Sequence, residues 1–227
     1  MSTHFVNLLD DLRRQSLRMA SQVEDMLHEA CETINEANRS VALRVIARDE
    51  EVDAAEIEVE SEVIRLLALY QPVGIDLRTL CTILKINSDL ERIADCAVNI
   101  AERGKHAKVQ APARDSAELR EMHPIVRQVL RSAVQAYAAS DLELARQVRA
   151  QDDAVDALYG QIVRSVIAGA SDRTADLAGW LDLLSVAKNL ERIADHAVNI
   201  AEDVIFLLTG QIVRHDHAPA PPPADGA

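Results

Sequence analysis

Apolar residues recur every three or four positions along most of the chain, a spacing that places them on one side of an α-helix. In the first stretch they are Phe5, Leu8, Leu12, Met19, Val23, Met26, Ala30 and Ile34. The same spacing predicts further long helices over residues 40–70, 76–104, 118–139, 141–167 and 176–208. With the first helix, over about 5–35, the pattern predicts an all-α chain of six long helices.

Residues that favour turns separate the first three of these helices. Ser40 is predicted to cap the second helix, and the run Gln71-Pro72-Val73-Gly74 ends it. Gly104 is predicted to end the third helix, because glycine readily adopts the left-handed conformation found at helix C-termini. Three helices are therefore complete before the first long gap in the apolar pattern.

The apolar pattern stops in two places. Residues 105–116 include a proline and few apolar side chains, which predicts a linker. From residue 211 on, prolines and alanines replace the periodic pattern, which is typical of a disordered tail. We therefore expect a first three-helix bundle over 1–104, a linker over 105–116, a second bundle over 117–210 and a tail over 211–227.

The third and sixth predicted helices share a nearly identical segment. Residues 90–102 read LERIADCAVNIAE and residues 190–202 read LERIADHAVNIAE, so that only Cys96 and His196 differ. The start of the second helix is repeated as well, at an offset of 103 residues. The chain is thus predicted to be a tandem duplication of an antiparallel three-helix bundle. Because a core tolerates many apolar exchanges, near-identity that includes polar positions suggests a constraint beyond packing.

Carboxylates make up much of the polar part of this repeat. On each third helix, a glutamate and an aspartate four residues apart lie on a stripe beside the apolar one. On each second helix, two aspartates four residues apart share the sector of the apolar residues and are expected to interrupt the inward face. A carboxylate placed there costs several kcal/mol unless it is protonated, paired or bound to a cation. These candidate ligands are Asp49, Asp53, Glu91, Asp95, Asp152, Asp156, Glu191 and Asp195.

Two arrangements would satisfy these carboxylates, and spacing alone favours neither. In the first, arginines such as Arg13 or Arg18 reach them, or they lie at a solvated rim. In the second, the aspartates of one helix and the Glu-x-x-x-Asp of its neighbour together bind a cation. Several oxygen ligands between helices suit magnesium, manganese or iron better than zinc.

Three residues near these carboxylates are not counted among the candidate ligands. Glu56 and Glu60 would extend the acidic face, but the second copy has Tyr159 and Val163 at these positions, so both are expected to be peripheral. His196 has a cysteine as its counterpart and is left out of the ligand set.

The composition of the chain limits the classes of function that it can have. Lys and Arg number 24 against 37 Asp and Glu, a formal charge of −13 at pH 7. Such a surface repels phosphate backbones and anionic lipids, so we expect neither nucleic-acid binding nor direct membrane insertion. The 3 cysteines lack Cys-x-x-Cys spacing and no signal peptide begins the chain, which favours a cytoplasmic protein. No motif of a known nucleophile, zinc hydrolase or phosphate-binding loop occurs, so no enzymatic activity is expected.

These features together resemble the PhoU family, the accessory proteins of the phosphate-specific transport system. The resemblance is carried by the duplicated unit, by the Leu-Glu-Arg-Ile-Ala-Asp-x-Ala-x-Asn-Ile-Ala-Glu motif in both copies, and by the run from Gln71 to Arg78. It covers about residues 5–210 and implies a three-helix bundle in each half. It also implies that the Glu-x-x-x-Asp motifs bind metal ions, often as clusters. The second-helix aspartates would complete each site.

The resemblance further implies a regulatory function. Members of the family are cytoplasmic negative regulators of the phosphate-starvation response, which keep a membrane sensor histidine kinase from activating its response regulator while phosphate is plentiful. The expected partners are that kinase, the ATPase subunit of the phosphate ABC transporter, and a second copy of the chain in a homodimer. The alternative is a metal-binding helical bundle with a structural or storage role and no phosphate signalling. A ferritin-like oxidase is disfavoured because it needs Glu-x-x-His motifs, whereas Glu191 and His196 are five residues apart.

Overall fold

A computed structural model describes residues 3–35, 38–105, 113, 115–149, 151–170 and 177–213. Within these ranges the chain forms α-helices and no β-strand, as the apolar periodicity predicts. Its helices include α1 (Thr3–Asn35), α2 (Arg39–Ala47), α3 (Asp49–Tyr70), α4 (Ile75–Gly104), α6 (Ala117–Ala139), α7 (Leu142–Arg149), α8 (Asp152–Ala170) and α9 (Leu177–Thr209).

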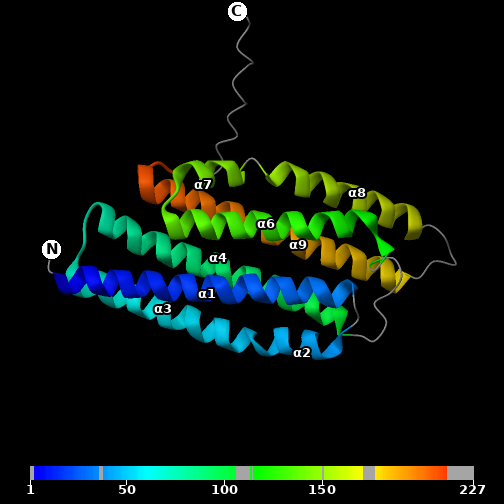
Figure 1. Ribbon diagram of the computed structural model, residues 1–227, viewed down its shortest axis with the longest axis horizontal. Helices are drawn as coiled ribbons and strands as arrows, with labels where there is room; N and C mark the ends of the chain where they lie inside the picture. The colour runs from blue at the N-terminus through cyan, green and yellow to red at the C-terminus, as the bar shows by residue number, and fades with distance from the viewer. Residues whose placement is uncertain are drawn as a thin grey trace, which may run out of the picture.

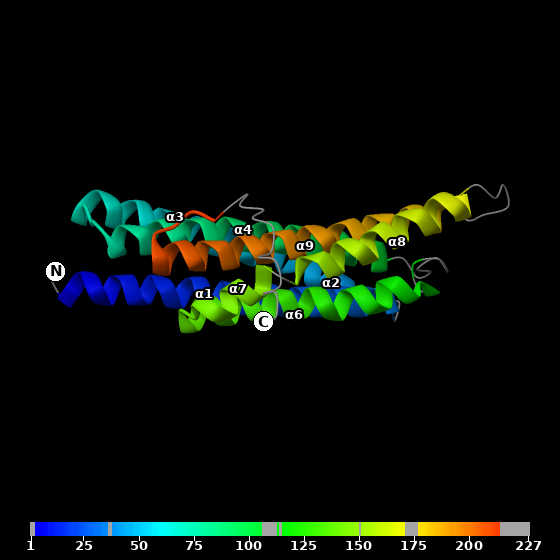
Figure 2. The ribbon, with the colours of Figure 1, turned by 90° about the horizontal axis from the view of Figure 1, so that it is seen from above.

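The helices form two bundles that lie side by side along the length of the molecule (Figure 1). One bundle holds α1 to α4 and the other holds α6 to α9, and successive long helices run in opposite directions. Seen from above, α1 and α6 lie on one side of the molecule, and α4 and α9 lie on the other (Figure 2). The fold is therefore the tandem duplication of an antiparallel three-helix bundle that the repeat predicts.

The predicted apolar stripes form the core. In α1 all of the stripe residues are buried except Leu8, which is partly buried. In the repeated segment, Ile93, Ala97 and Ile100 of α4 are fully buried, and so are their counterparts in α9. Burying an apolar side chain of the size of isoleucine contributes about 1.5–3 kcal/mol, so these two helices supply much of the stability.

The six predicted helices are present, but the second and the fifth are each divided in two. α2 gives way to α3 at Arg48. Arg44 lies in the last turn of α2, and Asp49, Glu50 and Glu51 occupy the first turn of α3. Basic charge at a helix C-terminus and acidic charge at an N-terminus stabilise both ends, which favours a break here. The fifth helix divides in the same way, with two arginines ending α7 and two aspartates beginning α8.

The start of α2 differs from its prediction. Asn38 is the N-cap, because its side-chain oxygen accepts hydrogen bonds from the backbone N–H groups of Ser40 and Val41. The prediction that Ser40 caps this helix is therefore wrong by two positions. At the other end, α3 stops as predicted: Gln71 adopts a left-handed backbone conformation, with φ of 45°, directly before Pro72.

Parts of the predicted linker and tail lie outside the described residues. These parts are 106–112 and 114 in the linker and 214–227 in the tail. Ala113, within the linker, is buried. None of the helices in the described ranges has the length and the apolar character that crossing a lipid bilayer requires.

The two bundles meet along α4 and α9, which run antiparallel and make the most extensive contact between them. Lys85 Nζ donates a hydrogen bond to Oδ1 of buried Asp203 at 2.6 Å. Further along, His196 Nδ1 lies 2.8 Å from Oδ1 of Asp89, which also accepts a hydrogen bond from Asn199 at 3.3 Å. His196 thus joins the two bundles, in contact with a carboxylate that is not one of the candidate ligands.

Candidate functional site

The candidate carboxylates of the first half lie where α3 packs against α4. Asp49 and Asp53 come from the first two turns of α3, and Glu91 and Asp95 come from the middle of α4. Charges interact across the gap between the helices, since Asp49 is repelled by Asp95 and Glu91 by Asp53. The structure therefore brings together all four residues that the sequence singles out in this half.

Glu56 also belongs to this group, so its prediction as peripheral is wrong. It is half-buried, and its pKa is raised, first by burial and then by the nearby carboxylates of Glu60 and Asp53. Its place seven residues after Asp49, two turns along one helix face, was the available signal. We call Asp49, Asp53, Glu56, Glu91 and Asp95 the first acidic cluster.

In this cluster, burial and mutual repulsion both raise the pKa values of Glu91 and Asp49. The pKa of Glu91 is raised, mainly by burial and then by the neighbouring charge of Asp95. The pKa of Asp49 is raised by burial and by Asp53 and Asp95. Asp49 is half-buried but Asp53 is exposed, so only the first of these aspartates borders the packed face as predicted.

The second acidic cluster consists of Asp156 on α8 and of Glu191 and Asp195 on α9. Partial loss of water around its carboxyl group raises the pKa of Asp195, and repulsion from Glu191 and Asp156 raises it further. Asp156 is exposed, so it does not interrupt the packed face, contrary to the prediction. Asp152 is the first residue of α8, and its side chain lies outside the described part of the structure.

A basic side chain neighbours each cluster. Arg92 lies 3.2 Å from Glu91 and 3.3 Å from Asp95. In the second half, Lys188 Nζ donates to both carboxylate oxygens of Glu191, at 2.7 and 2.6 Å. The carboxylates are thus paired in part, but by bases on their own helix rather than by α1.

Arg13, which the sequence offers as a partner for the aspartates, binds elsewhere. Its guanidinium donates to the carbonyl oxygen of Tyr137 at 2.8 Å and to Ser140 Oγ at 2.9 Å. It therefore ties α1 to the C-terminal end of α6, and the alternative in which Arg13 pairs with the acidic residues does not hold.

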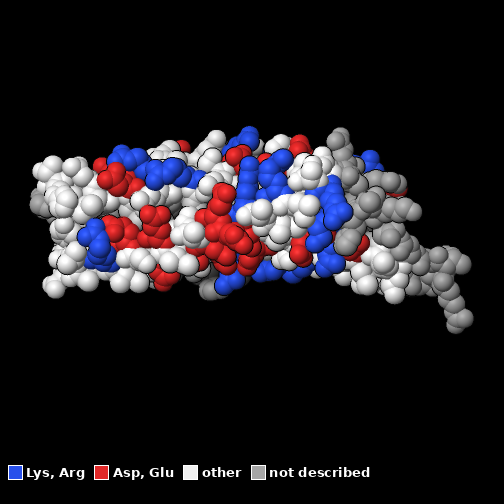
Figure 3. Space-filling model, turned by 90° about the horizontal axis from the view of Figure 1, so that it is seen from below, with Lys and Arg blue, Asp and Glu red and all other residues white. Residues whose placement is uncertain are grey.

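The donor chemistry of the first acidic cluster fits a hard cation such as Mg²⁺, Mn²⁺ or an iron ion, which prefer carboxylate oxygens. Acidic side chains gather near the middle of the face that carries α2 and α3 (Figure 3). Among the described residues, no three His, Cys, Asp or Glu side chains already surround one point as a closed metal site. Mutual repulsion disfavours a closer arrangement of these carboxylates, and a bound cation would offset that repulsion.

The raised pKa values predict how the stability of the metal-free protein changes with pH. The pKa of Glu91 is higher in the folded than in the unfolded chain, so its contribution is fully present below the ordinary carboxyl pKa. That contribution is lost as the pH rises through the folded pKa. We expect the stability of Glu91→Gln, which cannot ionise, to rise relative to that of metal-free wild type as the pH increases above about 4. Urea denaturation in chelator from pH 4 to 7 measures this, and identical slopes would contradict it.

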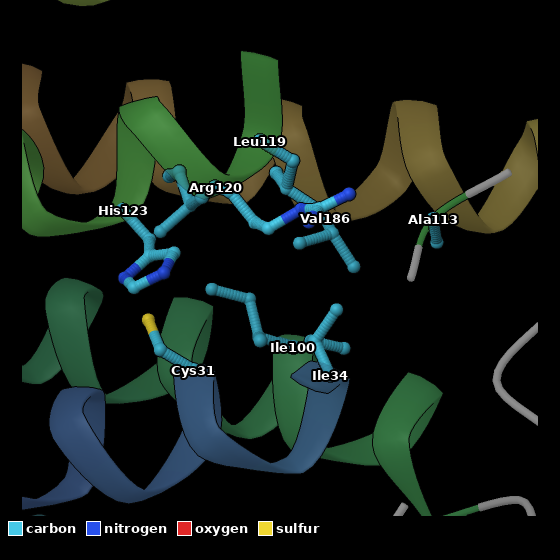
Figure 4. Close-up of a pocket in the computed structure, with 9 residues that line it drawn as sticks. Cys31, Ile34, Ile100, Ala113, Leu119, Arg120, His123 and Val186 are labelled. Carbon is cyan, nitrogen blue, oxygen red and sulfur yellow. The ribbon is translucent and has the colours of Figure 1, made fainter. Parts of the chain in front are cut away.

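A small cavity lies where α1, α4, α6 and α9 meet, and Cys31 points toward His123 across it (Figure 4). Its volume is about 10 Å³, enough for one water molecule at most. Burial raises the pKa of the Cys31 thiol to about 12 and lowers the pKa of His123. The thiol therefore stays protonated, which fits a packing role rather than a reactive one.

One protein-family model matches both halves of the chain, and curated relatives match over most of its length. The family model described as the PhoU domain matches residues 16–104 and 119–204. The phosphate-specific transport system accessory protein PhoU homolog of Xylella fastidiosa (strain Temecula1) is 35% identical over 212 residues, covering 92% of this chain and 88% of that protein. The protein of the same description from Aquifex aeolicus is 37% identical over 209 residues, covering 92% and 95%.

Solved structures match over a similar length. The crystal structure of PhoU from Pseudomonas aeruginosa superposes with a TM-score of 0.87 at 32% identity, covering 91% of this chain and 100% of that one. The phosphate transport system regulatory protein PhoU from Streptococcus pneumoniae has a TM-score of 0.83 at 24% identity, covering 92% and 99%, and shows the fold alone.

Proposed function

The chain belongs to the PhoU family, and on this premise we propose that it is an accessory protein of phosphate transport that represses the phosphate-starvation response while phosphate is plentiful. One observation carries the proposal. Both halves match the PhoU domain, over residues 16–104 and 119–204, and relatives 35% and 37% identical over 92% of the chain are named as phosphate-specific transport system accessory proteins.

In this proposal the protein acts through contacts in the cytoplasm. Its partners are the sensor histidine kinase of the phosphate response and the ATPase subunit of the phosphate ABC transporter, and two copies form a homodimer. Two antiparallel bundles side by side offer long helix faces, a geometry suited to contact with partner helices. The formal charge of −13 favours basic surfaces on those partners.

We also propose that the first acidic cluster binds a hard cation: magnesium, manganese or iron, singly or as a cluster. Asp49, Asp53, Glu91 and Asp95 would hold it. When bound, the ion supplies the positive charge that these facing carboxylates lack, so it would hold α3 against α4. The pKa values of Glu91 and Asp49 are raised by burial and then by repulsion between these carboxylates, and that repulsion supports this proposal. By the repeat, Asp152, Asp156, Glu191 and Asp195 would hold a second ion.

The experiment for the adaptor role is direct binding of the purified full-length protein to each partner. We expect saturable binding to the ATPase subunit and to the cytoplasmic part of the kinase, weakened by salt because the protein surface is acidic. Mn²⁺-loaded and chelator-treated protein are compared in the same assay. Absence of saturable binding to both partners would contradict the adaptor role and favour a metal-holding bundle without phosphate signalling.

A further inference from the structure

The two acidic clusters occupy matching positions in the two copies of the repeat, but the charged residues around them differ. Glu91 and Glu191 occupy the same position in the two copies of the motif. Three residues before them, one turn back on the helix, the first copy has Ser88 and the second has Lys188. A neutral side chain beside one cluster is thus matched by an ammonium group beside the other.

Lys188 is held by both helices that form the second acidic cluster. On α9, its Nζ donates to both oxygens of Glu191, at 2.7 and 2.6 Å, and the Glu191 side chain is only 15% exposed. On α8, the ammonium lies 5.3 Å from the centre of the Tyr159 ring, a cation–π contact. The ammonium therefore lies at the gap between α8 and α9.

The residue that contacts Lys188 from α8 is itself a difference between the copies. Tyr159 corresponds to Glu56, a member of the first acidic cluster. Where the first copy has the carboxylate of Glu56, the second has the aromatic ring of Tyr159, which attracts a cation. Where the first copy has Ser88, the second has that cation, the ammonium group of Lys188. Both changes reduce the need for a metal ion there.

Arg92 is the basic side chain beside the first cluster, with nitrogens 3.2 and 3.3 Å from Glu91 and Asp95. It is 53% exposed and Lys188 is 48% exposed, so exposure does not distinguish the two bases. Arg192, the counterpart of Arg92, interacts with Cys96 of α4. Each cluster thus has one basic neighbour, but Arg92 is shared between two carboxylates at longer distances, whereas Lys188 binds both oxygens of one glutamate. When Asp152 is counted as the counterpart of Asp49, the first cluster also has one carboxylate more, Glu56.

We propose that Lys188 is a built-in cation that occupies the second acidic cluster, so that the first cluster binds metal ions more tightly than the second. The ammonium uses both oxygens of Glu191, and a metal ion must displace it before it can use them. This inference rests on the proposed metal binding of the acidic clusters.

Exchange of the two residues tests this directly in the full-length protein. Mn²⁺ binding is measured by isothermal titration calorimetry and by elemental analysis after gel filtration. We expect Lys188→Ser to strengthen binding at the second cluster by about tenfold or more, since charge-assisted hydrogen bonds no longer compete. Adding Glu191→Gln should remove this gain. Ser88→Lys should weaken binding at the first cluster by a similar factor.

Two matched variants control for charge. Lys188→Arg keeps a cation at the position and should show no gain in Mn²⁺ binding. Arg146→Ser removes one positive charge from another pair three residues apart, with Glu143 on α7, and should leave Mn²⁺ binding as in wild type. A gain in either variant would show that net charge, rather than occupation of the cluster, sets the affinity.

Thermal unfolding gives a readout that is independent of affinity. In chelator, Lys188→Ser should melt below wild type because its carboxylates lose their counter-ion, and Mn²⁺ should restore more stability to the variant than to wild type. If Lys188→Ser gains no Mn²⁺ binding, or wild type binds equally well at both clusters, the inference is overturned. If wild type binds no Mn²⁺ but Lys188→Ser does, the role of Lys188 stands and the proposed metal binding of the first cluster fails.

Discussion

Glu91→Ala is expected to lower the affinity for Mn²⁺ by about hundredfold or more, since loss of even an outer partner of a metal ligand costs about 10–100-fold. Glu91 lies at the centre of the first acidic cluster. Its side chain is 16% exposed, and it interacts with Asp95 on its own helix and with Asp53 and Glu56 on α3. Calorimetry on chelator-treated protein titrated with Mn²⁺ measures the change.

Glu191→Ala is the matched control, because it removes the equivalent carboxylate of the repeat. Since Lys188 already pairs with Glu191, this variant should keep most of the Mn²⁺ binding that we propose for the first acidic cluster. The double variant, Glu91→Ala with Glu191→Ala, should contain no bound metal after purification. Metal content equal to that of wild type in the double variant would show that these glutamates are not ligands.

Ile93→Ala is expected to lower the free energy of unfolding by about 2–5 kcal/mol. Ile93 is fully buried on α4, the helix that packs against α1, α3 and α9. Truncation leaves a cavity that the closely packed surroundings can fill only in part. Urea denaturation monitored by circular dichroism measures the loss.

Ile57→Ala makes the same chemical change on α3, where the side chain is 63% exposed. It should change the unfolding free energy by no more than about 0.5 kcal/mol. If both variants lost a similar free energy of unfolding, burial of the side chain would not determine its contribution to stability, and this prediction would be contradicted.

Helix positions could be predicted from the sequence because periodicity within one helix decides which face is buried. The breaks at Arg48 and before Asp152 were not predicted, because the apolar pattern continues across them. The change of charge at each break, from arginine to acidic residues, was a signal that periodicity does not contain. Apolar periodicity therefore predicts where helices form, whereas the charged residues indicate where a helix breaks.

Membership of the acidic clusters was predictable in part. Asp53 and Asp156 each follow a buried valine by one residue, about 100° around the helix, which leaves them at the exposed edge of the packed face. Comparison of the two copies sets Glu56 apart because its counterpart is Tyr159, although repeats can diverge where one site changes its role. The two copies differ at this position in sequence and in contacts, and averaging over the repeat hides that difference.

The pairing of His196 with Asp89 could not be predicted from either helix alone. It depends on how α4 and α9 dock, which sets the two residues 2.8 Å apart although they are 107 positions apart in the chain. The same holds for Lys85 and Asp203. Pairs between the bundles follow from packing of the complete chain rather than from local spacing.

Alkaline phosphatase activity in cells that lack this protein, grown in abundant phosphate, tests the regulatory role most directly. We predict high activity in these cells and low activity once the intact gene is restored, because the sensor kinase would otherwise stay active. The Glu91→Ala gene serves in the same assay to show whether repression needs the first acidic cluster. Activity that stays low without the protein would contradict its role as a negative regulator of the phosphate-starvation response.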